Sequence, residues 1–145
     1  MAYTTDSDLV KIRPNILDLK VDSWYDMHVT AATIVDEILE MRWYRQEAVN
    51  REVNYNTSPF DGDKLNTTQI KRLVCYKVLE LCYEYLMKGT AEPDGYERLM
   101  HMYQDRFDGE LQRLLVLGIH YDWDADDELE QTEKFSRGVR RLARI

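Results

Sequence analysis

Residues 70–87, which read IKRLVCYKVLELCYEYLM, constrain the fold most, because this stretch is apolar on nearly every side of a helix. Over its last three turns the polar positions form one narrow stripe, Lys77, Glu80, Glu84 and Lys88. A helix of this kind must be covered on most sides by other elements. Its frequent charges distinguish it from a membrane span of the same length. The apolar positions with i, i+3, i+4 spacing are Ile70, Leu73, Val74, Val78, Leu81, Cys82 and Tyr85.

The overall composition favours a globular chain with a real core. The sequence has 145 residues, of which 44% are hydrophobic and 32% are charged, which is too apolar for a disordered chain. The net charge of −8 argues against a general nucleic-acid binder, although a local basic arm remains compatible with it. The N-terminal residues lack the basic-then-apolar pattern of a secretory signal, so we expect synthesis in the cytoplasm.

The two cysteines, Cys75 and Cys82, lie seven residues apart on the same predicted helix. Two helical turns separate them by roughly 10 Å, which is too far for a mutual disulfide. We therefore expect two buried, reduced thiols.

Four capping patterns predict where helices begin. Each places a capping side chain three residues before an acid or an amide, a spacing at which each side chain can reach the other's backbone N–H group. The four pairs are Thr5 with Asp8, Ser23 with Asp26, Asn66 with Gln69, and Asp94 with Glu97.

These starts, with the apolar periodicity, predict an all-α fold. We expect a bundle of three long helices plus a short N-terminal helix, with an extended C-terminal arm. The expected helices are residues 6–12, 24–50, 70–87 and 96–117, in a core domain of residues 1–118. Residues 119–145 would then form an acidic turn and a basic arm. The polar end of the second helix, near residues 42–52, is expected to project from the core.

The stretch of residues 53–65 has turn-forming residues and no periodicity. Loops of this length without internal structure are uncommon in compact domains and are often functional. We expect it to project and to contact a neighbouring subunit through Tyr55, Pro59 and Phe60.

The C-terminal stretch separates its charges into two blocks. Residues 119–133 contain seven acidic residues and no Lys or Arg, whereas residues 134–145 contain five basic residues and no acid. Such blocks are typical of surfaces that meet a partner.

The acidic block also has the spacing of an EF-hand calcium loop, with carboxylates at positions 1, 3, 5 and 12 of a 12-residue window. Asp127 stands at position 6, where the loop normally has glycine, so the turn would hold a strained backbone. We therefore leave three possibilities open: a calcium site, an EF-like turn without metal, and a plain acidic surface. The candidate ligands are Asp122, Asp124, Asp126, Glu128 and Glu133.

The sequence contains no catalytic motif. His28, His101 and His120 lie far apart and have no partner at the spacing of a metal site or a catalytic triad. There is no glycine-rich phosphate loop and no motif for a nucleophile. We expect a protein that is not an enzyme and has no cofactor, apart from the calcium ion considered above.

Two segments resemble head–tail connector (adaptor) proteins of tailed bacteriophages. They are the opening YTTDSDLVKIRPNIL and the end LLVLGIHYDWDADDELEQTEKFSRGVRRLARI. The second runs from a helix into a G-I-x-Y-D segment, a D-x-D turn and a closing R-L-x-R tail.

The resemblance implies a homo-oligomeric ring, commonly of twelve copies, in the neck of the virion. The ring would dock under the portal protein, contact the next neck or tail protein, and pass DNA through its lumen without sequence-specific binding or contact with a membrane. An acidic lumen would let DNA slide. No catalytic residues come with this resemblance. The arm residues expected to bind the portal are Phe135, Arg137, Val139, Arg140, Arg141, Leu142, Arg144 and Ile145.

Two other functions fit parts of the sequence. The acidic turn would suit a calcium-responsive protein-binding module, and the basic tail would suit a small helical regulator that binds nucleic acid. A monomer whose helicity changes with calcium would favour the first of these.

Overall fold

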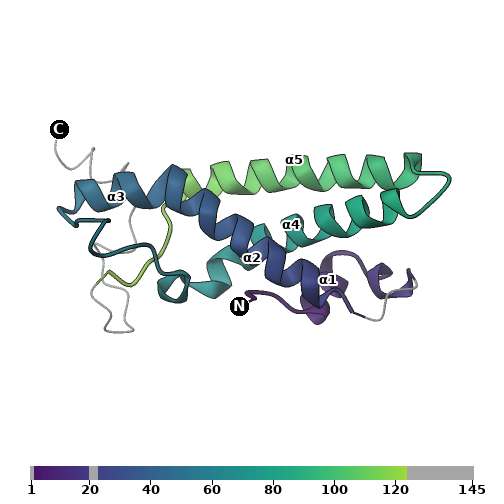
Figure 1. Cartoon of the computed structure of the whole chain (residues 1–145), viewed down its shortest axis with the longest axis horizontal. Helices are drawn as coiled ribbons and strands as arrows, with labels where there is room; N and C mark the ends of the chain where they lie inside the picture. The colour runs from purple at the N-terminus through teal and green to yellow at the C-terminus, as the bar shows by residue number, and fades with distance from the viewer. Residues whose placement is uncertain (1, 20–22, 124–145) are drawn as a thin grey trace. The chain divides into compact units, whose positions relative to one another are not determined.

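The computed structural model describes residues 2–19 and 23–123, and these residues are mostly helical (Figure 1). Within them there is no β-strand, only an isolated antiparallel bridge between Leu65 and Tyr121. The prediction of an all-α chain is therefore confirmed for the described part. The helices are α1 (Asp6–Ile12), α2 (Tyr25–Leu39), α3 (Arg45–Asn50), α4 (Thr67–Lys88) and α5 (Asp94–Leu117), with 3-10 turns at Ile16–Asp18 and Gly62–Lys64.

The chain divides into two compact units, each built from two separate stretches. The first unit comprises Met1–Val35 and Lys71–Glu110, and the second comprises Asp36–Ile70 and Leu111–Ile145. The boundary expected after residue 118 stays a prediction, because most of the residues beyond it lie outside the described part.

The core of the first unit is the predicted apolar helix packed against tyrosines of α5. Leu73, Val78 and Cys82 of α4 are fully buried, as the periodicity predicts. The rings of Tyr83 on α4 and Tyr103 on α5 stack with centroids 5.9 Å apart and planes within 2°. Offset stacking of this kind adds to the free energy of burying the two rings, and so helps to join the two helices.

One polar position of the predicted stripe is buried instead. Glu80 is only 8% exposed, and its carboxylate lies 2.9 Å from the ammonium group of Lys77. The Lys77 ammonium also lies 4.3 Å from the ring centroid of Phe107. A buried carboxylate needs such a partner, because an unpaired charge is costly away from water. The periodicity predicted which positions form the polar stripe, but it did not predict that Glu80 is buried.

The second long helix is continuous from Tyr25 to Asn50, as predicted, but it contains a π-helical turn at Glu40–Tyr44. The expectation that its polar end projects is wrong, because Trp43, Tyr44 and Ala48 are buried. A π turn has i→i+5 hydrogen bonds and shifts the helical phase by about one residue. This shift places Trp43, Tyr44 and Ala48 on the same side of the helix as the buried Leu39.

The predicted helix starts are confirmed in part. At α1, the Thr5 N–H group donates to Asp8 Oδ2 at 2.9 Å, as the capping pair requires. At α2, Ser23 Oγ accepts from the N–H group of Tyr25 at 3.2 Å. The acidic partner at this second start is Asp6 of α1 and not Asp26.

Candidate functional site

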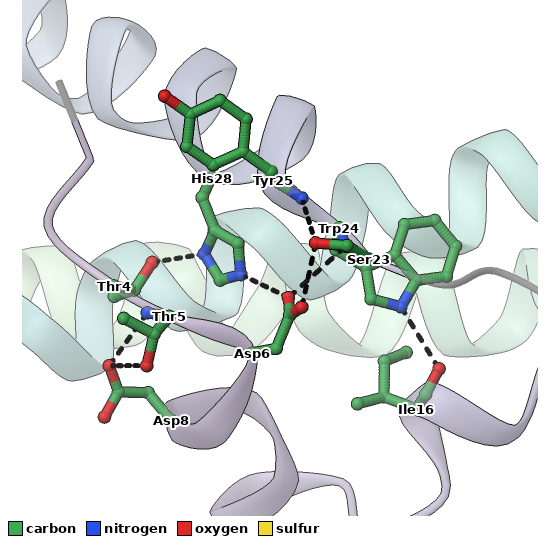
Figure 2. A network of polar contacts seen from close by, with 9 residues as sticks. All are labelled: Thr4, Thr5, Asp6, Asp8, Ile16, Ser23, Trp24, Tyr25 and His28. Carbon is green, nitrogen blue, oxygen red and sulfur yellow. Dashed lines mark hydrogen bonds and ion pairs between the residues drawn. The ribbon is translucent and has the colours of Figure 1, made fainter.

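A row of three polar side chains links the N-terminal segment of the first unit to α2 (Figure 2). Thr4 Oγ1 lies 2.6 Å from His28 Nδ1, and His28 Nε2 lies 2.9 Å from Asp6 Oδ1. Thr4 and His28 are buried, at 4% and 2% exposure. Both ring nitrogens of His28 therefore have a partner, as a buried imidazole requires.

Asp6 also holds the first turn of α2. Its Oδ2 accepts from Ser23 Oγ at 3.0 Å, and its Oδ1 accepts from the Trp24 N–H group at 3.3 Å. A carboxylate at a helix N-terminus satisfies free N–H groups and is favoured by the helix dipole. Figure 2 shows Asp6 between Ser23, Trp24 and His28, which makes this carboxylate the centre of the network.

The order hydroxyl, imidazole, carboxylate is also that of a catalytic triad. A nucleophilic hydroxyl must meet its substrate, however, and the Thr4 residue is almost completely buried. The geometry therefore suits a structural role, in which the network holds the N-terminal segment against α2. These contacts could not be predicted from the sequence, because Thr4 and His28 are 24 residues apart and no local pattern pairs them.

The second unit contains a cluster of five aromatic rings, which we call the aromatic cluster. Its members are Trp43 and Tyr44 from the π turn, Phe60 from the loop of residues 53–65, and Tyr121 and Trp123 from the segment that follows α5.

Tyr121 is the centre of this cluster. Its ring centroid lies 4.7 Å from that of Trp123, 5.4 Å from that of Tyr44 and 5.8 Å from that of Phe60. The Tyr121 hydroxyl accepts a hydrogen bond from the Asp61 N–H group at 3.1 Å. Burial raises the pKa of this hydroxyl above its usual range, so it stays neutral. A ring with these contacts cannot move without disturbing three segments.

A charged pair lies against the cluster. The Arg51 guanidinium stacks 4.8 Å from the ring centroid of Trp123, and its Nε donates to Glu47 Oε1 at 3.1 Å. The Glu47 side chain is 2% exposed and that of Arg51 is 13% exposed. Removing one member of a buried pair leaves an uncompensated charge and is strongly destabilising.

The segment after α5 is fixed by the side chain of Gln69. Its Nε2 donates to the Gly118 carbonyl and its Oε1 accepts from the His120 N–H group, both at 2.8 Å. The Asn66 N–H group donates to the His120 carbonyl at 3.2 Å. Asn66 also caps α4, because its Oδ1 accepts from the Gln69 N–H group at 3.2 Å. The predicted capping pair is therefore half right, since the Gln69 amide binds a distant segment instead.

Asp122 is the one candidate calcium ligand among the described residues. It is 8% exposed, and its N–H group donates to the Lys64 carbonyl at 2.9 Å. Within residues 2–19 and 23–123, no group of three or more His, Cys, Asp or Glu side chains could hold a metal ion. The other candidates, Asp124, Asp126, Glu128 and Glu133, lie outside the described residues.

The loop candidates separate into exposed and packed residues. Tyr55 is 36% exposed, with the Arg45 guanidinium 5.7 Å from its ring centroid, and Pro59 is exposed. Phe60 lies against Tyr44 and Tyr121 of its own chain. Contact with another subunit therefore stays a prediction, and it is better suited to Tyr55 and Pro59 than to Phe60. The predicted portal-binding residues, from Phe135 onward, lie outside the described part of the chain.

The two cysteines are buried and unpaired with each other, as predicted. Burial raises the pKa of the Cys75 thiol to about 12 and that of Cys82 further still. Both thiols are therefore protonated at neutral pH and unsuited to nucleophilic chemistry.

Neither models of known protein families, nor curated proteins, nor solved structures match this chain. Across residues 2–19 and 23–123, no helix is both long enough and apolar enough to cross a membrane.

Proposed function

We propose that this chain is a structural subunit of an oligomeric head–tail connector ring of a tailed bacteriophage. In this proposal the core is a bundle of three long helices with a short N-terminal helix, and residues 134–145 form an arm that docks to the portal protein. The ring lies in the neck of the virion and forms part of the DNA channel. The net charge of −8 suits a channel along which DNA slides.

The observation that carries the proposal is the local role of the two segments that resemble connector proteins. In the opening segment, Thr4 and Asp6 form the polar network with His28. In the closing segment, Tyr121 is the centre of the aromatic cluster. The opening segment and the described part of the closing segment, up to Trp123, therefore have specific packed contacts, which supports reading the resemblance at the level of architecture.

The fixed start of the closing segment supports the same proposal. The G-I-x-Y-D run at residues 118–122 is held by Gln69 and by the bridge between Leu65 and Tyr121. A surface that is already ordered loses less conformational freedom when a partner binds.

The decisive experiment measures the mass of the purified chain by light scattering, alone and mixed with a portal protein. A discrete high-order oligomer, or one that forms only with the portal, is expected. A monomer under both conditions contradicts the proposal.

The arm is tested by ending the chain after residue 133. The truncated chain should keep its helicity and lose portal docking. Arg140→Glu with Arg141→Glu should weaken docking in the full chain. Arg72→Glu with Arg98→Glu is the control, because it makes the same charge change at exposed positions of the first unit. Unfolding of the truncated chain would place the arm in the core and contradict its assigned role.

Calcium provides the test of the alternative function. If the acidic turn holds the ion, calcium should raise the melting temperature, and Asp124→Ala with Glu133→Gln should abolish that rise. If basic residues neutralise the turn instead, calcium should have no effect on the parent. The two substitutions should then weaken assembly in a salt-dependent way.

A further inference from the structure

The first unit has an open groove beside the C-terminal end of α4, with a volume of about 720 Å³. It is formed by the last turn of α4, the turn that follows it, the start of α5 and the end of the 3-10 turn Ile16–Asp18. The residues that line it are Asp18, Leu19, Tyr85, Leu86, Lys88, Gly89, Thr90 and Tyr96.

Two tyrosines give this groove a fixed aromatic wall. Tyr85 is 56% exposed, and its ring meets Trp24 edge-on at 6.1 Å. Tyr96 stacks on the buried Tyr83 ring at 6.1 Å. Each ring is therefore held from behind while it lines the groove.

The charges of the groove favour a cationic occupant. Asp18 contributes an exposed carboxylate, and the last carbonyl groups of α4 carry the negative end of its dipole. Among the described residues of the lining the lysine is Lys88, which lies 3.1 Å from Glu84 Oε1, so its charge is already paired. Aromatic faces and a carboxylate together bind guanidinium and ammonium groups, and the apolar wall accepts the stems of those side chains.

The C-terminal segment of residues 134–145 has the matching chemistry. It has five basic residues and no acid, interleaved with Phe135, Val139, Leu142 and Ile145. The first unit has thirteen acidic and nine basic residues, so its net charge is opposite to that of the segment. Complementary charge of this kind favours and orients association.

We propose that the groove binds residues 134–145 of a second copy of this chain while the ring assembles, before the same residues dock to the portal protein. The inference rests on the proposed function, because a groove-to-tail contact joins two different surfaces and can pass from copy to copy until a ring closes. A tail bound in its own groove would occupy both surfaces within one chain and leave nothing to join the next copy.

Two variants that each lack one side of the contact provide the test. Asp18→Lys reverses the charge of the groove at an exposed position, and Arg140→Glu/Arg141→Glu/Arg144→Glu reverses the tail. Sedimentation velocity of the full chains measures self-association alone and in an equal mixture. Each variant alone should associate about tenfold more weakly than the parent. The mixture should recover a complex of two chains, because an intact tail meets an intact groove.

Asp108→Lys is the matched control, because it makes the same charge change at an exposed position of α5 outside the groove. It should associate like the parent. The proposal is overturned if the mixture recovers no complex, if Asp18→Lys associates as strongly as Asp108→Lys, or if the parent stays monomeric at about 1 mM. A tail bound in its own groove would give the last of these results, because the groove of each parent chain would already be occupied.

Failure of this contact is distinguishable from failure of the connector proposal. If the mixture recovers a two-chain complex but the parent forms no ring with a portal, the groove contact stands and the connector ring is rejected. If the ring forms equally well with Asp18→Lys, the ring stands and the groove contact is rejected.

Discussion

The polar network of the first unit and the aromatic cluster of the second hold the chain in physically different ways. In the polar network, one carboxylate, Asp6, accepts hydrogen bonds from Ser23 and Trp24 and pairs with His28. In the aromatic cluster, five rings from three stretches of the chain fill a common volume. The network depends on a few directional contacts, most of them to the Asp6 side chain, whereas the cluster depends on volume and shape.

This difference determines what kind of substitution each region tolerates. A hydrogen-bond network fails when one acceptor is removed, because the buried donors left behind lose their partners. A cluster of rings tolerates loss of a polar atom better than loss of volume.

The largest effect is expected at the centre of the aromatic cluster. Tyr121→Ala removes a ring that is 2% exposed and should lower the free energy of unfolding by about 3–5 kcal/mol. Tyr121→Phe keeps the volume and loses the hydrogen bond from Asp61, so it should cost only about 1 kcal/mol. Urea unfolding followed by circular dichroism measures both. Equal losses for the two variants would show that the hydroxyl, and not the volume, holds this region.

The next largest effect is expected at Asp6. Asp6→Ala removes the acceptor shared by Ser23, Trp24 and His28 and should lower the free energy of unfolding by about 2–3 kcal/mol. Here a change that keeps the size should not rescue stability, because Asp6→Asn lacks the charge and one acceptor oxygen. Urea unfolding followed by circular dichroism should report the loss. Full stability of Asp6→Asn would contradict the assigned role of the carboxylate.

A smaller loss is expected at Gln69. Gln69→Ala removes two 2.8 Å hydrogen bonds that hold Gly118 and His120 and should cost about 1–2 kcal/mol. Both hydrogen bonds are partly buried, which limits the cost. Thr68→Ala, at a neighbouring exposed position of α4, is the control and should change stability little. Hydrogen exchange at residues 118–121 should be faster in Gln69→Ala than in the parent or in Thr68→Ala. Protection equal to that of the parent would contradict the role of Gln69 in holding this segment.

The same contrast explains what could be predicted from the sequence. The helices of the first unit follow from apolar periodicity, because Leu73, Val78 and Cys82 recur at the spacing of one helical face. Helix α1 was also predictable, since Thr5 and Asp8 form a local capping pair. These features depend on residues that are close together in the sequence, where spacing determines geometry.

The aromatic cluster and the polar network depend on distant contacts and could not be predicted. Phe60 and Tyr121 lie in stretches without periodicity, and nothing local indicates that they meet. The projecting end predicted for the second helix was also wrong, because the prediction rested on the polar residues of 42–52 and no local pattern indicates the π turn that helps to bury Tyr44. The sequence hint for Tyr121 was its place in an apolar-aromatic stretch directly after a helix end, and that pattern does not name a partner.

The smallest effect on stability is expected at Asp8, and it should depend on pH. Desolvation raises the pKa of Asp8, but the hydrogen bond from the Thr5 N–H group and the nearby Lys71 ammonium outweigh it, so the pKa lies below its ordinary value. Lys71 Nζ lies 3.6 Å from Asp8 Oδ1. A lowered pKa means that the folded state favours the ionised carboxylate. This contribution is present above the unfolded pKa of about 3.9 and is lost as pH falls through the folded value.

Asp8→Asn should therefore destabilise the chain by about 0.5–1 kcal/mol at pH 7, the usual cost of a lost capping contact. The difference from the parent should shrink as pH falls below about 4, because the parent carboxylate then takes up a proton. Urea midpoints between pH 7 and pH 2.5 measure this, with Asp105→Asn on the exposed side of α5 as the control. Tyr121→Ala should lose the same stability across this range, since its cost is volume and not charge. If the stability difference between Asp8→Asn and the parent stayed constant across the range, Asp8 would act through its shape and not its charge. It would then not differ in kind from the rings of the aromatic cluster.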